Sequence, residues 1–325
     1  MKINYYFRKP EPTNFSIENV FETVQQNLPD GITYTSLSAS RTLDIGYLLK
    51  LKTLQADVHH ITGAINYAAL ALPSSRTVLT IHDLGHLTET LKGIKKEIYK
   101  LLFWNLPLKK IRYLTTISDF TQREVKKYCN VNGKKIKTIY NPVSADFHVR
   151  PKHENEYPVI LQIGGGANKN IETLIEAVMG IKCKLILVRP ASEHLISLLQ
   201  QKKIDYEFRS QLTKNQLIEC YANCDLLFFA SSYEGFGLPI IEAMASGRPV
   251  ITANIDPMKE IAGGCALLVD WKSASEICDA INQVWRNKSL YAELQSKGLE
   301  HARQFNPKRI TDEYLDFYYD MVANA

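Results

Sequence analysis

The sequence predicts an α/β protein built from two doubly wound domains, and three features of the chain lead to this prediction. Short apolar runs typical of buried parallel strands alternate with amphipathic segments through residues 1–140. The same alternation resumes at residue 159. Between the two halves, residues 141–158 hold three prolines and a group of charges, a composition typical of a linker. Alternation of strands and helices favours parallel sheets with helices on both faces.

The first half contains six expected strands, each a short run of apolar and β-branched residues: 2–7, 33–37, 57–61, 78–81, 113–117 and 136–140. Five helical patterns separate them: 16–27, 42–51, 65–72, 94–110 and 118–129. The helix at 16–27 places Ile17, Val20, Phe21 and Val24 on one face, which predicts burial of that face.

The second half contains six further expected strands: 159–164, 185–188, 206–208, 226–229, 250–253 and 266–269. Helices are expected to open at Ile171 and at Leu238, and others at 274–284 and 290–304. An aromatic helix at 307–322 follows.

Bulk composition limits the class of protein. With 325 residues, the chain is long enough for two domains of ordinary size. It is 45% apolar and 22% charged, and no apolar run approaches the ~20 residues of a membrane span. The first ten residues lack the apolar core of a signal peptide, and the six cysteines are scattered. We therefore expect a cytoplasmic protein with reduced thiols.

The stretch 231–250 predicts an anion site. A turn that contains Gly235 and Gly237 lies between two apolar strands and leads into a helix opened by Leu238 and Pro239. Free N–H groups and the positive end of the helix dipole at such a turn suit a phosphate. Glu234 lies in the turn and Glu242 inside the helix.

Each of these glutamates has two interpretations. Glu234 is either an ordinary loop carboxylate or an acceptor of hydrogen bonds from sugar hydroxyls. Glu242 is either a solvent-facing helical residue or a partner for a second set of hydroxyls, such as those of a ribose. Its apolar helix leaves little exposed face, and a charge in such surroundings requires a partner.

The segment Glu234-Gly-Phe-Gly-Leu-Pro-Ile-Ile-Glu242 resembles the Glu-x7-Glu signature of glycosyltransferase family 4, whose members are retaining enzymes with the GT-B fold. The resemblance implies two Rossmann-like domains that face each other across a cleft. It assigns 1–145 to an acceptor-binding domain and 158–305 to a nucleotide-sugar-binding domain. The C-terminal helix, 307–325, is expected to return onto the first domain.

A glycine-rich turn, 164–170, follows the first strand of the second half. It is not the Gly-x-Gly-x-x-Gly pattern of dinucleotide enzymes, because the third glycine is absent. Lys169, together with N–H donors, could hold a diphosphate, and the turn resembles the family's phosphate loop. Many members carry an arginine where this chain has Asn168, which leaves the loop one cation short. Arg189, at the end of the next strand, either supplies that cation or is only an exposed strand-end residue.

His82 follows a buried strand, where doubly wound sheets place ligand-binding groups. It resembles the family histidine that lies beside the donor sugar and the acceptor. The alternatives are a histidine that merely ends the strand, or a metal pair with His86 and Asp83. The family needs no metal, so none is expected. Ser118 resembles a cleft-facing serine of the family, with no role assigned.

The resemblance implies transfer of a sugar from a UDP- or GDP-sugar to a glycan or lipid-linked acceptor, in surface polysaccharide or glycoconjugate assembly. No cofactor is expected. The residues expected to be catalytic are His82, Glu234 and Lys169. The residues expected to bind the donor are Gly164, Gly165, Asn168, Lys169, Arg189, Glu234, Gly235, Phe236, Gly237, Leu238 and Glu242.

Two other functions stay open at this stage. One is another GT-B enzyme, such as a nucleotide-sugar 2-epimerase or a phosphorylase, although the extra carboxylates or the lysine-bound cofactor that these need are not evident. The other is a non-catalytic scaffold that binds a nucleotide sugar.

Residues 92–137 form a basic region, with 13 Lys and Arg against three acids. Such a charge suits an anionic membrane surface, a phosphorylated acceptor or a nucleic acid. No nucleic-acid-binding module is recognisable, so we do not expect a nucleic acid to bind. The helix at 91–110 carries an apolar stripe: Ile94, Ile98, Leu101, Leu102 and Leu106. Either this helix packs on its own sheet, or it docks on the inner face of the membrane with Phe103 and Trp104 as wedges.

Overall fold

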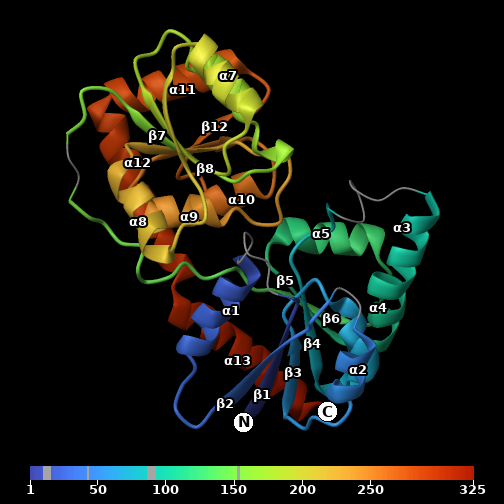
Figure 1. Cartoon of the computed structure of the whole chain (residues 1–325). Helices are drawn as coiled ribbons and strands as arrows, with labels where there is room; N and C mark the ends of the chain where they lie inside the picture. Colours follow the sequence, from blue (N-terminus) through green and yellow to red (C-terminus); the bar gives the residue numbers. More distant parts are fainter. Residues whose placement is uncertain (10–15, 42–43, 86–92, 152–153) are drawn as a thin grey trace. The chain divides into compact units, whose positions relative to one another are not determined.

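The structure is a computed structural model that describes residues 1–9, 16–41, 44–85, 93–151 and 154–325. The chain divides into two compact units (Figure 1). Unit 1 is Met1–Pro142 together with Pro307–Ala325, and unit 2 is Val143–Asn306. Most of the expected linker therefore belongs to unit 2. Its start is fixed there because the Val143 N–H donates to the Phe305 carbonyl at 2.9 Å.

The sheet of unit 1 has six parallel strands in the order β2-β1-β3-β4-β5-β6. They are β1 (Lys2–Phe7), β2 (Thr33–Ser38), β3 (Val58–Ile61), β4 (Thr77–Ile81), β5 (Tyr113–Thr116) and β6 (Lys135–Thr138). The α-helices are α1 (Ser16–Gln26), α2 (Ile45–Leu51), α3 (Gly93–Lys100), α4 (Leu106–Lys110), α5 (Asp119–Tyr128) and α13 (Pro307–Ala323). The expected strands of this half are confirmed. The helix expected at 65–72 is a 3-10 helix, Asn66–Ala71, and residues 42–43 of another lie outside the described residues.

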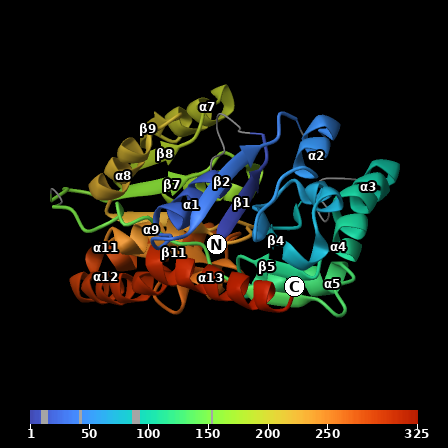
Figure 2. The same ribbon diagram turned by 90° about the horizontal axis from the view of Figure 1, so that it is seen from below.

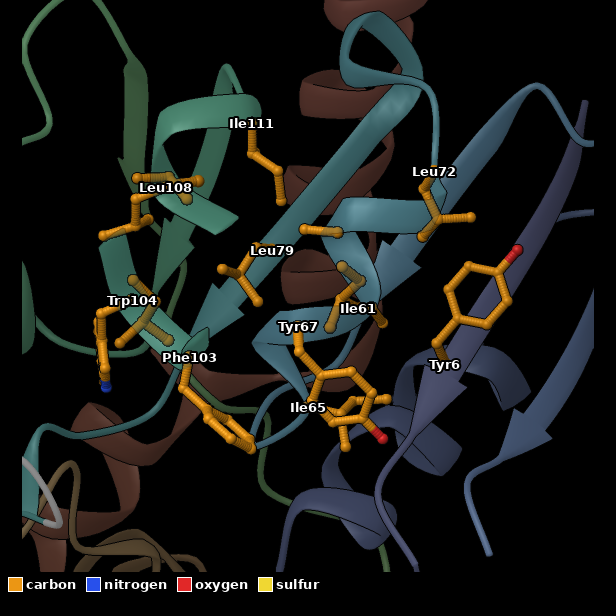
Figure 3. Close-up of a cluster of buried hydrophobic side chains, with 14 of the residues drawn as sticks. Tyr6, Ile61, Ile65, Tyr67, Leu72, Leu79, Phe103, Trp104, Leu108 and Ile111 are labelled. Carbon is orange, nitrogen blue, oxygen red and sulfur yellow. The ribbon is translucent and has the colours of Figure 1, made fainter. Parts of the chain in front are cut away.

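The two faces of this sheet carry different aromatic cores, because successive side chains of a strand point to opposite faces. Tyr6 of β1 and Ile61 of β3 belong to one buried cluster, together with Tyr67 and with Phe103 (Figure 3). This cluster lies between the sheet and the segments 65–72 and 99–111.

The opposite face is covered by α1 and α13, which pack against each other (Figure 2). Tyr5 and His60 on this face contact Phe21 of α1, and His60 also contacts Tyr314 and Tyr318 of α13. The Nδ1 atom of His60 lies 2.5 Å from the Tyr318 hydroxyl. Residues separated by most of the chain thus share one core.

The basic helix expected at 94–110 is divided into three parts. Between α3 and α4 the backbone forms a π-helical segment, Leu101–Asn105. Pro107 has no N–H to donate to the preceding turn, which favours a wider turn at this point. The wider turn changes which side chains face the sheet.

The structure corrects one part of the membrane alternative for this helix, the two aromatic wedges. Phe103 and Trp104 are buried in the core cluster, so they are not available as membrane wedges. Ile94, Ile98 and Leu101 are instead 77%, 54% and 47% exposed. Within the described residues, no helix combines the length and apolarity needed to cross a bilayer.

The sheet of unit 2 also has six parallel strands, in the order β12-β11-β10-β7-β8-β9. They are β7 (Val159–Ile163), β8 (Lys184–Val188), β9 (Asp205–Arg209), β10 (Leu226–Phe229), β11 (Val250–Ala253) and β12 (Leu267–Val269). The helices are α6 (Ile171–Ala177), α7 (Glu193–Gln201), α8 (Lys214–Asn223), α9 (Leu238–Ala245), α10 (Met258–Ala262), α11 (Ala274–Arg286) and α12 (Lys288–Ala302). The strand order reverses between β7 and β10, and ligands of doubly wound sheets bind at such a switch point.

Candidate functional site

Three segments meet at the carboxyl edge of the unit 2 sheet: the turn 164–169 after β7, the turn 231–237 after β10, and Arg189 after β8. The Gly164 N–H donates to the Val188 carbonyl at 3.1 Å, which places Arg189 beside the first turn. The Ser232 N–H donates to the Asn168 carbonyl at 2.8 Å, which joins the two turns. We call these three segments the switch-point site.

The centre of the switch-point site is an ion pair between Lys169 and Glu234. Both side chains are largely shielded, at 16% and 17% exposure. The Lys169 ammonium also lies 4.5 Å from the centroid of the Phe229 ring. Lys169 belongs to a 3-10 turn, Ala167–Lys169, that precedes α6. Two residues expected to be catalytic are therefore in contact.

Asn168 joins the two turns. Its side-chain Nδ2 donates to the Tyr233 carbonyl at 2.9 Å and to Glu234 Oε1 at 3.3 Å. These bonds turn the amide toward 233–234, and the donor-binding role expected for Asn168 stays a prediction. The contact could not be anticipated, because the two residues are far apart in the sequence.

At two positions of the site the backbone has a positive φ angle that favours glycine. Gly164 has φ +109°, and a Cβ there would lie 2.5 Å from Lys169 Cε. Gly237, the residue before α9, has φ +104°, and its Cβ would lie 3.1 Å from Ile240 Cδ1. Larger residues rarely adopt such φ values. Gly164 thus makes room for the Lys169 stem.

The remaining residues of the second turn contribute mainly through the backbone. Phe236 is buried and packs edge-on against Phe305, with 6.0 Å between ring centroids, so its side chain is directed into the unit 2 core. Gly235 and Leu238 are half-buried on either side of Phe236 and Gly237. Gly235 and Gly237 have no side chains, so at these two positions the turn can offer a ligand only backbone N–H and C=O groups.

Glu242 lies on α9, and its Oε2 accepts a hydrogen bond from the Tyr221 hydroxyl at 2.6 Å. Burial raises the pKa of Glu242 to about 7, against the opposite effect of the Tyr221 hydrogen bond. Tyr221 belongs to α8 and was not identified from the sequence. The one signal was a charge in an apolar helix, which requires a partner without naming it.

His82 lies in unit 1, immediately after β4. Its Nε2 is 2.6 Å from the Thr62 carbonyl. A carbonyl only accepts, so Nε2 carries the hydrogen and Nδ1 of the neutral ring is an acceptor. Burial lowers the pKa of His82, which favours this neutral form. Gly63 permits the arrangement, because a Cβ there would lie 2.5 Å from His82 Cδ2.

Two neighbours of His82 complete this part of unit 1. Ser118 is fully buried and caps α5 by accepting from the Thr121 N–H at 3.0 Å. Asp83 accepts from the Gly85 N–H at 2.8 Å. His86, the other member of the alternative metal pair, lies outside the described residues.

Solved structures share this two-unit α/β fold. The protein HepE of Anabaena, in complex with UDP and glucose, has a TM-score of 0.77 at 16% identity, covering 97% of this chain and 98% of its own. A sucrose-phosphate synthase of Thermosynechococcus elongatus has a TM-score of 0.80 at 16% identity over 100% of both chains. These likenesses establish the fold: two Rossmann-like units of the GT-B class.

Two family descriptions match consecutive parts of the chain. "Glycosyltransferase Family 4" matches residues 15–147, and "Glycosyl transferases group 1" matches residues 144–301. Together these two matches cover residues 15–301, and they place the chain in glycosyltransferase family 4.

Two of the similar proteins are O-antigen chain mannosyltransferases. The O-antigen chain mannosyltransferase RfbU of Salmonella typhimurium is 30% identical over 224 residues, which are 63% of this chain and 62% of the relative. O-antigen chain mannosyltransferase B of Escherichia coli is 24% identical over 272 residues, 75% of this chain and 70% of the relative. The chain thus spans less than two thirds of the length of the first of these relatives.

Proposed function

We propose that this protein is a retaining, metal-independent glycosyltransferase. It transfers a sugar from a nucleotide-diphosphate sugar to a glycan or lipid-linked acceptor in surface polysaccharide assembly. The observation that carries this proposal is the contact between Lys169 and Glu234 at the switch-point site. The O-antigen relatives support the role in polysaccharide assembly, and the complex of HepE with UDP supports a nucleotide donor.

The proposed donor would replace the ion pair by two separate interactions. Its phosphate oxygens would accept from the Lys169 ammonium and from N–H groups of the turn before α9. Its sugar hydroxyls would donate to the Glu234 carboxylate, and its ribose hydroxyls to Glu242. Each partner of the Lys169–Glu234 pair thus exchanges one charge-assisted bond for another. This exchange avoids leaving a shielded charge unpaired.

In the proposed reaction the anomeric C–O bond to the diphosphate breaks, and the acceptor oxygen bonds to the anomeric carbon on the same face. The acceptor proton passes to an oxygen of the departing phosphate. Lys169 stabilises the negative charge that develops on the diphosphate, which is the main catalytic contribution of this site. His82, neutral with Nδ1 as an acceptor, would orient a hydroxyl at the reacting centre.

The first test is calorimetric titration with UDP-, GDP- and ADP-sugars without added metal. Wild type is expected to bind one donor selectively, and Glu242→Ala is expected to weaken it by at least tenfold, since hydrogen bonds to a charged group contribute about 1.5–3 kcal/mol. Glu219→Ala is the control, because Glu219 is an exposed helical glutamate of the same unit. A folded protein that binds no donor would contradict the proposal. Donor binding without sugar transfer to any acceptor would favour the scaffold. Conversion of the free nucleotide sugar to its epimer would favour an epimerase.

We also propose that the protein acts at the inner face of the membrane as a peripheral protein. The supporting observation is the exposed apolar row on and after α3, formed by Ile94, Ile98 and Leu101, within a region that is strongly basic. An exposed apolar row combined with a basic flank is typical of interfacial helices.

Co-sedimentation with vesicles tests this location. Vesicles of phosphatidylcholine with phosphatidylglycerol are expected to bind wild type at low salt and to release it at high salt. The double variant Ile94→Glu/Ile98→Glu is expected to lose most of this binding. The control is Ile45→Glu/Leu49→Glu, an exposed apolar pair with the same spacing on α2, at 69% and 61% exposure. Equal loss in both double variants would refute a specific role for α3.

A further inference from the structure

Arg189 is only partly satisfied by its surroundings. Its Nη2 donates to the Gly165 carbonyl at 3.1 Å. Its Nε and Nη1 atoms are shielded from solvent and have no hydrogen-bond partner among the described residues. A guanidinium carries five N–H donors, and shielded donors without an acceptor are costly. Such a group is completed by an acceptor that offers two neighbouring oxygens to the guanidinium fork, such as a phosphate.

The fold places Arg189 at the glycine turn of the switch-point site. Strands β7 and β8 are paired in parallel, with Ile163 opposite Val188, so the residues that follow each strand are neighbours. The Lys169 stem passes over Gly164, and the Arg189 side chain contacts Gly165. The two cations therefore lie at consecutive glycines of one turn.

The charge at this turn is otherwise too small for a diphosphate. Lys169 is neutralised by Glu234, and Asn168 carries no charge and is bonded to the turn at 233–234. Burial lowers the pKa of the Arg189 guanidinium, and the Glu172 carboxylate acts in the opposite direction without forming an ion pair with Arg189 among the described residues. Arg189 is thus the cation of this turn that no carboxylate neutralises among the described residues.

We propose that Arg189 binds the diphosphate of the donor and supplies the positive charge that the uncharged Asn168 cannot. The proposal rests on the proposed function, because it needs a nucleotide-diphosphate donor at the switch-point site. Lys169 and Arg189 hold the diphosphate from two sides of Gly164–Gly165. Asn168 is left to join the two turns.

Calorimetry with nucleotide fragments tests this role. The probes are UDP and GDP, whichever binds wild type, and the matching nucleoside. Arg189→Gln is expected to weaken diphosphate binding by 10- to 100-fold and nucleoside binding by less than twofold. Arg189→Lys, which keeps the charge without the planar fork, is expected to lose less. Arg286→Gln removes an exposed arginine of the same unit and is expected to change neither.

Three results would overturn the proposal. The first is unchanged diphosphate binding in Arg189→Gln. The second is equal loss of nucleoside and diphosphate binding with a lower melting temperature, because that result indicates a structural role. Both leave the proposed function intact. The third is a folded wild type that binds neither UDP nor GDP and none of the three nucleotide sugars, and it removes the proposed function together with this inference.

Discussion

At the scale of single residues, Glu242 connects donor binding to pH. Its carboxylate must be ionised to accept from two ribose hydroxyls, and burial raises its pKa to about 7. Donor affinity should therefore fall as the pH is lowered from 8 to 6, because the protonated form keeps only part of its accepting capacity. Titration of the donor at several pH values measures this dependence.

The Tyr221 hydroxyl stabilises the ionised form of Glu242 by donating to it at 2.6 Å. Tyr221→Phe removes that donor, so the midpoint of the affinity profile should move to higher pH. A residue needed only for packing would lower affinity equally at all pH values. Tyr319→Phe, at a tyrosine that is 53% exposed, is the matched control and should leave the midpoint in place.

At the scale of elements, His60 fastens α13 to the sheet of unit 1. Its Nδ1 pairs with the Tyr318 hydroxyl and its Nε2 with the Thr80 hydroxyl at 2.6 Å. Burial lowers the pKa of His60 to about 3, below its usual 6.5. A depressed histidine pKa means that folding favours the neutral ring, so stability is complete above pH 6.5 and decreases as the pH falls toward 3.

Tyr318→Phe should lower the free energy of unfolding of unit 1 by about 1–3 kcal/mol, because it leaves a buried polar atom of His60 without a partner. Urea denaturation at pH 7 measures the loss, and Tyr319→Phe is again the control. A second series from pH 7 to pH 4 should show decreasing stability of wild type. A flat profile in that range would contradict the assignment of a neutral His60.

The element scale also shows what can be predicted from sequence. The strands could be predicted because each is a short apolar run, a pattern visible in the local sequence. The parallel pairing of β7 with β8 then brings Arg189 to Gly164. The two histidines of β3 gave no such signal, because their partners come from β1, β4 and α13. The face of α3 was also not predictable, since the wider turn at 101–105 depends on how the Pro107 region packs. The Tyr221–Glu242 pair joins two helices with a strand between them in sequence, and only the packed structure reveals it.

At the scale of the whole molecule, unit 1 depends on a segment that lies beyond unit 2 in the sequence. Six apolar side chains of α13 are buried: Ile310, Tyr314, Leu315, Phe317, Tyr318 and Met321. At ~1.5–3 kcal/mol each, their burial contributes about 9–18 kcal/mol, as much as the entire stability of a typical domain, ~5–15 kcal/mol.

A chain that stops at Asn306 should therefore lose the folded state of unit 1 and keep that of unit 2. Thermal unfolding is expected to show one transition. Bound nucleotide should still raise the temperature of that transition, since the switch-point site lies within unit 2. A truncated chain that retains both transitions at the wild-type temperatures would show that α13 adds little to unit 1.

The same division sets the order of events while the ribosome makes the chain. Unit 2 is continuous, but the sheet face of unit 1 that carries Tyr5 and His60 has only α1 as cover until α13 has been made. Between Pro142 and Pro307 the ribosome adds 164 residues, about 10–30 s of synthesis at ~5–20 residues per second. During that interval the part of this aromatic sheet face that α13 covers stays exposed on the nascent chain. Chaperone demand should be concentrated there, on the half of the protein that emerges first and is finished last.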